Sequence, residues 1–306
     1  MIPSEPRLAE IATRPSRLHL WWTAARPRTL SIALTPVVVG CAIAWSEGAA
    51  LNFPVFLATL ACALLIQIGT NLLNDVADFE RGNDRPERVG PLRVTAAGWA
   101  TPRQVRRAGV LAFAAAALCG LGLVIHGGAA ILALGFASIA AGWAYSGGVR
   151  PVSHSPLGEL FVLAFFGIVA VCGSHYLQSG RLSAVAIATG FALGAMAAAV
   201  LLVNNHRDVD GDRKAGRRTL AAVLGPARSR SLHAALMLLP FALPLWLAFG
   251  ARSHAATLLA LLALPLALIA IRNMRSKQGV ALNPVLGQTA LAQLAFGTLL
   301  AIGMLL

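Results

Sequence analysis

The sequence predicts an all-α protein, a polytopic membrane helical bundle in which about nine transmembrane helices form a single domain over residues 1–306. One reason is composition, because hydrophobic residues make up 57% of the chain and charged residues only 12%, a balance unlike that of soluble globular domains. The other is a series of apolar runs long enough to cross a bilayer. Nine can be drawn, at roughly 20–45, 53–74, 104–126, 128–146, 157–178, 183–204, 229–250, 254–272 and 284–305.

The ends of these runs carry residues typical of helix termini. No apolar core precedes Trp21, so residues 1–19 are predicted to be a cytoplasmic N-terminal segment and no cleavable signal peptide is expected. Thr101 and Pro102 are typical of a helix start, with Thr as N-cap and Pro in the first turn. Only His126 and two glycines separate the third and fourth runs, so the boundary between these two predicted helices is the weakest of the boundaries between runs.

The chain has a net charge of +13, and the distribution of its basic residues between the connections predicts its orientation in the membrane. Arginines gather before the first run and in the connections 2–3, 6–7 and 8–9, whereas connections of the opposite parity carry only Arg181 and Arg252. By the positive-inside rule the N-terminus and the basic connections are cytoplasmic and the C-terminus is outside, which suits a cytoplasmic (inner) membrane protein. Because the charges lie beside apolar spans, nucleic acid is not an expected partner.

All six aspartates lie in two short polar segments, 71–93 and 204–221, at the ends of the second and sixth runs. Asn71, Asp75 and Asp78 are spaced four and three residues apart, and Asn204, Asp208 and Asp212 four and four, so each set shares one helical face. Asp210 points roughly the opposite way from Asp208 and is predicted to be solvent-facing or structural. We therefore expect one site, built from cytoplasmic loops 75–103 and 205–228.

Carboxylates at the edge of a bilayer are costly unless they are paired or bind cations. If the two faces meet, four carboxylates converge, and hard oxygen ligands of this kind suit Mg²⁺ together with phosphate oxygens. The four cysteines stand alone in apolar runs and the histidines lack metal spacing, so zinc is not expected.

Basic residues are interleaved with these acids. Arginine fits phosphate oxygens bidentately and lysine supplies a point charge, so the segments predict a phosphate-bearing ligand. The alternative is that these cations only set orientation, which would require no aspartates. The predicted diphosphate-binding residues are Asn71, Arg81, Arg88, Arg93, Asn204, Lys214 and Arg217.

The residues resemble the UbiA superfamily of intramembrane prenyltransferases, and more closely its naphthoate branch. The resemblance covers nearly the whole chain and rests on ARPRTL at 25–30, Pro36, Gly40, NDVADFERGND at 74–84, RVGPLR at 88–93, WAYSGG at 143–148, GELFVLAFFGIVAVCGSHYLQ at 158–178 and NNHRDVDGDRKAGRRTLAAVLG at 204–225. Gly82 followed by Asp84, Arg218 in place of Lys, and His175 in place of a small polar residue depart from the wider pattern.

The resemblance implies a UbiA-type fold and an Mg²⁺-dependent transfer of a polyprenyl group from polyprenyl diphosphate to 1,4-dihydroxy-2-naphthoate, with loss of CO₂ and diphosphate, giving demethylmenaquinone in menaquinone biosynthesis. It also implies two metal ions, held by Asp75 and Asp78 and by Asp208 and Asp212, with Asp84 as a further ligand. Other aromatic acceptors, 4-hydroxybenzoate or homogentisate, stay open.

Candidates for the acceptor pocket or the tunnel are Arg26, Tyr145, Glu159, Tyr176 and Gln178. Glu159 is equally explained as an acid that the dipole stabilises in the first turn of a helix. Aromatic residues at span ends are as often interface anchors.

Three other functions remain as alternatives. An ion-coupled transporter usually carries its acids mid-span at broken helices, whereas these lie at the ends of unbroken runs. A CDP-alcohol phosphotransferase has one continuous acidic motif instead of two. A non-catalytic membrane scaffold leaves the clustered aspartates unexplained.

Overall fold

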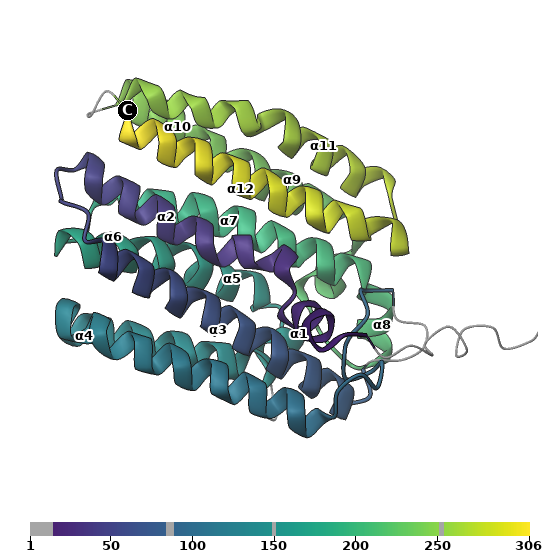
Figure 1. Ribbon diagram of the computed structural model, residues 1–306. Helices are drawn as coiled ribbons and strands as arrows, with labels where there is room; N and C mark the ends of the chain where they lie inside the picture. Colours follow the sequence, from purple (N-terminus) through teal and green to yellow (C-terminus); the bar gives the residue numbers. More distant parts are fainter. Residues whose placement is uncertain (1–14, 84–88, 149–150, 251–253) are drawn as a thin grey trace, which may run out of the picture.

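The computed structural model describes residues 15–83, 89–148, 151–250 and 254–306, and these residues form helices and connecting loops without a β-strand. The helices lie roughly side by side along one direction (Figure 1). The all-α prediction is confirmed. In chain order the elements are α1 (Arg17–Ala25), η2 (Pro27–Thr29), α2 (Leu30–Ser46), α3 (Phe53–Glu80), α4 (Pro102–Ser146), η3 (Val152–His154), α5 (Gly158–Leu163), η4 (Ala164–Val169), α6 (Ala170–Ser179), α7 (Ala184–Arg207), α8 (Val209–Lys214), α9 (Leu220–Leu238), η5 (Leu239–Phe241), α10 (Ala242–Phe249), η6 (Ala255–Ala263), α11 (Leu264–Ser276), η7 (Gly279–Leu282) and α12 (Asn283–Leu305).

The number of spans agrees with the predicted count of about nine. Among the described residues seven helices are long and apolar enough to cross a membrane, and the bent pair α1 and α2 makes an eighth. Helix α4 has 45 residues and is bent at Gly128, whose φ of 69° and ψ of −158° are not helical. A helix of this length would be about 68 Å long if it were straight, twice what a bilayer core needs, so its halves are two spans.

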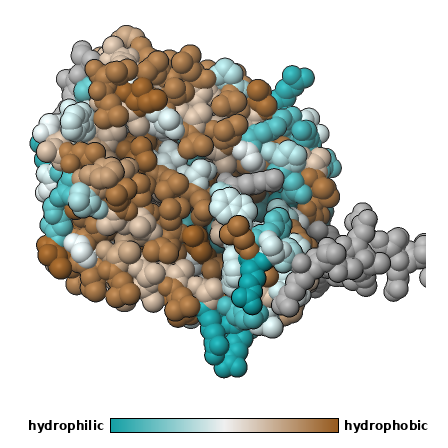
Figure 2. All heavy atoms as spheres, in the orientation of Figure 1, coloured by the Kyte–Doolittle hydropathy of each residue, from teal (hydrophilic) through white to brown (hydrophobic). Residues whose placement is uncertain are grey.

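Apolar packing places α7 at the centre of the bundle. Leu193, Met196 and Ala199 of α7 pack with Val39 of α2 and Phe296 of α12 in the main core. Brown, apolar side chains cover most of the face shown in Figure 2, and teal, polar ones gather mainly toward its right-hand and lower edges. The molecule therefore has the surface of a multi-pass membrane protein.

The span at 158–179 is not a regular α-helix, because η4 is a π-helical segment at Ala164–Val169. Three glycines bring it against α7: a Cβ built on Gly167 would lie 2.2 Å from the carbonyl oxygen of Gly190 and 2.5 Å from Cα of Gly194. Such close contact between backbones is typical of small residues at membrane helix interfaces. The wider π turn leaves Phe165, Phe166 and Val169 on the lining of the central cavity.

The ends of α3 and α7 that carry the aspartates lie at the same end of the bundle as α1 and α8, while the C-terminus lies at the other end (Figure 1). The predicted start of the third span is also found: Thr101 caps α4 and forms a reciprocal capping box with Gln104, with Pro102 in the first turn.

Candidate active site

One large cavity, with a volume of about 1530 Å³, connects the two acidic segments with the apolar interior. Its polar end is lined by Asp78, Arg93, Asp208, Asp212 and Arg217. The wall then continues through Tyr145, Phe161 and Phe165 to an apolar end lined by Cys62, Leu123, Ile131 and Leu177. The cavity thus combines a charged mouth with a long apolar wall.

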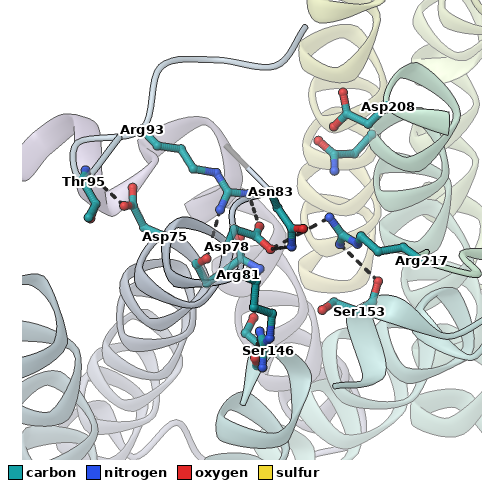
Figure 3. Close-up of polar contacts among 12 residues, drawn as sticks. Asp75, Asp78, Arg81, Asn83, Arg93, Thr95, Ser146, Ser153, Asp208 and Arg217 are labelled. Carbon is teal, nitrogen blue, oxygen red and sulfur yellow. Dashed lines mark hydrogen bonds and ion pairs between the residues drawn. The ribbon is translucent and has the colours of Figure 1, made fainter. Parts of the chain in front are cut away.

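Arginines hold the charged mouth together (Figure 3). Nη2 of Arg93 lies 2.5 Å from Oδ2 of Asp78, and the Asn83 amide donates to Oδ1 of Asp78 at 3.0 Å. Nη1 of Arg217 lies 3.9 Å from Asp78 and 3.3 Å from Asp212, and its Nη2 donates to the carbonyl of Ser153. One guanidinium therefore bridges the acids of α3 and α8, so the two segments do meet as the sequence predicts.

Asp212 is buried at the base of α8, and the hydroxyl of Thr219 donates to its Oδ2 at 3.4 Å. Burial raises the pKa of this carboxyl to about 6; Arg217 opposes the shift and the negative charge of Asp208 adds to it. Asp212 is therefore a group that takes up a proton in mildly acidic solution unless a further cation joins Arg217 beside it.

Asp75 has a different environment from Asp78. Its two oxygens accept hydrogen bonds from the backbone N–H groups of Val94 and Thr95, each at 3.2 Å, and it is 2% exposed. These bonds hold the segment 89–95 across the end of α3. Asp75 does not line the cavity as Asp78 does, so its place in this structure is that of a loop anchor.

The asparagines of α3 also connect elements. The amide of Asn71 donates to the carbonyl of Ala25 at 2.9 Å, and that of Asn74 donates to the hydroxyl of Ser146 at 2.9 Å. Both residues line the cavity. Asn71 therefore remains at the predicted diphosphate position, while its amide secures the bend between α1 and α2.

Arg81, predicted to bind diphosphate, makes its contacts at the end of α4. Its Nη1 and Nη2 donate to the carbonyls of Ser146 and Gly148, at 2.7 and 2.8 Å, and it is absent from the cavity lining. The last carbonyls of a helix have no partners within it, and a guanidinium satisfies them. Arg81 thus caps the end of α4. The predicted site residues Asp84 and Arg88 lie outside the described residues.

The second segment keeps its helical phase across a small break. Helix α7 ends at Arg207, but the N–H groups of Asp208 and Asp212 still bond to carbonyls four residues earlier. Asn204, Asp208 and Asp212 consequently all line the cavity. Asp210 also borders the mouth of the cavity, but its side chain is 89% exposed and faces solvent, 3.9 Å from Nη1 of Arg213. Lys214 is exposed at the mouth.

Two residues of the site were missed by sequence reasoning. The buried guanidinium of Arg207 donates through Nε and Nη2 to both oxygens of Asp208, at 2.9 and 2.6 Å, through Nη2 to Asn204 and through Nη1 to Asn283. An arginine next to the aspartate at the end of an apolar span was a usable signal for Arg207. Asn283 lies 76 residues beyond Arg207 in the chain, and nothing in its own neighbourhood distinguished it.

The five acceptor or tunnel candidates lie in three places. Arg26 and Tyr145 line the cavity near Asn74, toward which Nη2 of Arg26 donates at 3.4 Å. Arg26 has a left-handed backbone, with φ of 54°, at the bend between α1 and α2. Glu159 is 3% exposed and lies behind the cavity wall, where the lining residue Asn205 donates to its Oε1 at 3.0 Å.

Tyr176 and Gln178, predicted as acceptor or tunnel residues, are not among the residues that line the cavity, although Tyr176 packs against the cluster that contains Leu123 and Leu177 of its apolar end. Gln178 accepts from the backbone N–H of Asn52, at the start of α3, and so lies at the end of the bundle away from the acids. The 22 residues of the span 158–179 rise by about 33 Å, which separates its two ends by a membrane thickness. His175 lies there too and pairs with Glu47 at 3.2 Å, so its identity does not bear on the acceptor.

The fit to Mg²⁺ can be judged from the donors. Within the described parts of the chain, no group of three His, Cys, Asp or Glu side chains converges on a point that could hold an ion by itself. Asp78, Asp208 and Asp212 nevertheless line one mouth with oxygen donors. This arrangement suits Mg²⁺ bound by a few carboxylates and shared with substrate phosphates.

Comparisons of the chain with a family model, with curated proteins and with solved structures all lead to the same family. The model of the UbiA prenyltransferase family matches residues 33–300. Among curated proteins, 1,4-dihydroxy-2-naphthoate octaprenyltransferase of Mycobacterium tuberculosis is 41% identical, covering 92% of this chain and 95% of its own, and that of Escherichia coli is 37% identical, covering 95% and 96%. The structure of a UbiA homolog from Archaeoglobus fulgidus bound to DMAPP and Mg²⁺ superposes with a TM-score of 0.64 at 17% identity, covering 92% of this chain and 99% of that one.

Proposed function

The chain belongs to the UbiA prenyltransferase family, and from this premise we propose that it transfers a polyprenyl group to 1,4-dihydroxy-2-naphthoate. Diphosphate and CO₂ leave, and the product is the reduced form of demethylmenaquinone. The observation that carries the proposal is a single cavity with paired aspartates and arginines at its mouth and apolar walls behind. The two naphthoate octaprenyltransferases that match nearly the whole chain support the acceptor.

The residues divide the reaction between them. We place Asp78, Asp208 and Asp212 as the carboxylates that hold Mg²⁺, which supplies charge neutralisation for the diphosphate when bound. Arg93 and Arg217, which already lie beside these acids, bind phosphate oxygens. The apolar wall accommodates the prenyl chain and excludes water from the allylic cation.

The bonds balance without an external reactant. The carbon–oxygen bond of the prenyl diphosphate breaks and its electron pair leaves with the diphosphate. The ring carbon that bears the carboxylate then attacks the allylic cation, and the carbon–carboxylate bond releases its electron pair to the ring as CO₂ departs. The product keeps both ring hydroxyls.

We further infer an inner-membrane orientation in which the acidic loops and the N-terminus are cytoplasmic and the C-terminus is outside. The arginine asymmetry supports it, and α1 and α8 lie together at the end away from the C-terminus. A cysteine placed at Gly211, which is exposed on α8, should react with an impermeant maleimide only when added to the cytoplasmic side. Reaction from the periplasmic side would reverse the orientation.

The aspartates of the second segment provide a matched pair. Asp208→Asn should lower kcat by about 100-fold or more, as when a preorganised electrostatic group is lost. Asp210→Asn, with its side chain in solvent, should stay near the parent value. Purified variants assayed with polyprenyl diphosphate and the naphthoate give the comparison, and equal losses in both would refute the assigned face.

Activity should require Mg²⁺ or Mn²⁺ and disappear in EDTA, since the mouth offers oxygen ligands. The half-saturating Mg²⁺ concentration should rise about tenfold from pH 7.5 to pH 5, because Asp212, whose pKa is raised to about 6, must lose its proton to bind metal. Asp210→Asn serves as the control that keeps this pH dependence. Full turnover in metal-free buffer would remove the metal from the proposal.

Carbon-14 in the carboxylate distinguishes the acceptors. With the naphthoate, one labelled CO₂ should appear for each diphosphate released, because the prenyl group replaces the carboxylate. A 4-hydroxybenzoate enzyme would prenylate beside the carboxylate and retain it, whereas homogentisate, whose acid is on a side chain, is distinguished by whether it is prenylated at all. The purified enzyme is given each acceptor with the same polyprenyl diphosphate; retained label in the prenylated product rejects the naphthoate and leaves the family chemistry intact.

A further inference from the structure

The segment 89–95, which we call the roof, covers the mouth of the cavity between the two acidic segments. Val89, Pro91, Leu92 and Arg93 of the roof line the cavity. At one end the roof is held by α3, through the backbone bonds to Asp75 and the ion pair of Arg93 with Asp78. At the other end it is held by a residue of α12.

That residue is Asn283, the first residue of α12, and it uses both halves of its amide. Its Nδ2 donates to the carbonyl of Val89 at 3.1 Å, and its Oδ1 accepts from Nη1 of Arg207 at 2.9 Å. Arg207 in turn holds both oxygens of Asp208. A continuous chain of hydrogen bonds therefore runs from the roof through Asn283 and Arg207 to Asp208.

We propose that Asn283 is a positioning residue that couples closure of the roof to the orientation of Arg207, and through it to the carboxylate of Asp208. The inference rests on the proposed function, in which Asp208 binds the metal and diphosphate. When the roof is closed, the bond to Val89 fixes the amide of Asn283, and this amide holds Arg207 in its observed direction. When the roof lifts for diphosphate to enter, the bond to Val89 breaks, the amide can rotate, and Arg207 loses a fixed acceptor.

The chemistry of the two bonds explains why an amide is needed. A carboxylate could accept from Arg207 but could not donate to Val89, and an apolar side chain could do neither. The side chain of Arg207 is 1% exposed, so water does not readily replace a lost acceptor. Removing a partner of a buried charged group costs more than removing a neutral surface hydrogen bond. The two bonds of Asn283 can therefore be tested separately.

The experiment compares Asn283→Asp, which keeps the acceptor for Arg207 and loses the donor to Val89, with Asn283→Leu, which loses both. Asn273→Asp is the matched control. Asn273 lies on α11, and its amide donates to Oε1 of Gln288 on α12 at 2.8 Å; neither residue lines the cavity. Each change is made in the full chain carrying Val89→Cys, because Val89 is half-buried over the cavity at the end of the roof that Asn283 holds and becomes more accessible when the roof lifts. Labelling at position 89 by a polar maleimide is followed by mass spectrometry, and binding of Mg²⁺ with inorganic pyrophosphate by calorimetry.

Both variants of Asn283 should speed labelling of position 89 about fivefold, the change in an opening equilibrium expected when one hydrogen bond is lost. Pyrophosphate affinity should fall less than about threefold in Asn283→Asp and about tenfold or more in Asn283→Leu, since only the latter strips a partner from the buried guanidinium. Asn273→Asp should change neither quantity. Where the leucine variant is not a single species after size exclusion, Asn283→Ala replaces it.

Unchanged labelling at position 89 in both variants overturns the proposal. Faster labelling with equal pyrophosphate affinity in the Asp and Leu variants also overturns it, because Arg207 would then not be oriented through Asn283. Neither measurement uses the naphthoate or a prenyl chain. A failure of the acceptor assignment in the carboxylate assay is thus distinguishable from a failure of this link.

Discussion

Carboxylates buried at the end of an apolar helix bundle are stable only where positive charges or hydrogen-bond donors lie beside them. The mouth of this cavity is organised by that constraint. Asp78 has Arg93, Arg217 and Asn83, Asp212 has Arg217 and Thr219, and Asp75 has two backbone N–H groups. Because the partners come from different segments of the chain, satisfying the acids also fixes how the roof and α8 sit against α3 and α7.

The same arginines suit a negatively charged ligand. A guanidinium that balances an aspartate can turn to phosphate oxygens when a divalent cation takes over the carboxylate, so the site can exchange one set of ion pairs for another without leaving a buried charge unpaired. Arg217 is best placed for this exchange, since it lies between acids of both segments. An arginine with a purely structural role would need only one of these two aspartates as its partner.

Sequence reasoning was most successful where local geometry decides the outcome. Spacings of three and four residues predicted that Asp78, Asp208 and Asp212 line one cavity and that Asp210 is exposed to solvent at its mouth, because helical phase is a property of the chain itself. Span number followed from hydropathy for the same reason. The metal and diphosphate roles of these residues remain predictions.

Residues whose roles depend on long-range packing were less predictable. Arg81 looked like a phosphate ligand, but it caps α4, whose end is brought to it by the fold. Tyr176 and Gln178 belong to a motif that begins near the site, yet a helix carries them to the far end of the bundle. Asn283 joins the site from the last helix, and no periodicity within α12 reports a partner 76 residues earlier.

The π-helical segment shows how the apolar interior supports the charged mouth. Its glycine contacts with α7 lock one cavity wall to the helix that carries Asn204 and leads into Asp208. Phe161 and Phe165, whose ring centroids are 4.7 Å apart, are therefore held in fixed relation to the acids. A cation formed at the mouth meets aromatic faces and apolar side chains instead of water, which favours attack by an electron-rich ring over hydrolysis. Packing of small residues deep in the membrane thus contributes to the chemistry expected at its edge.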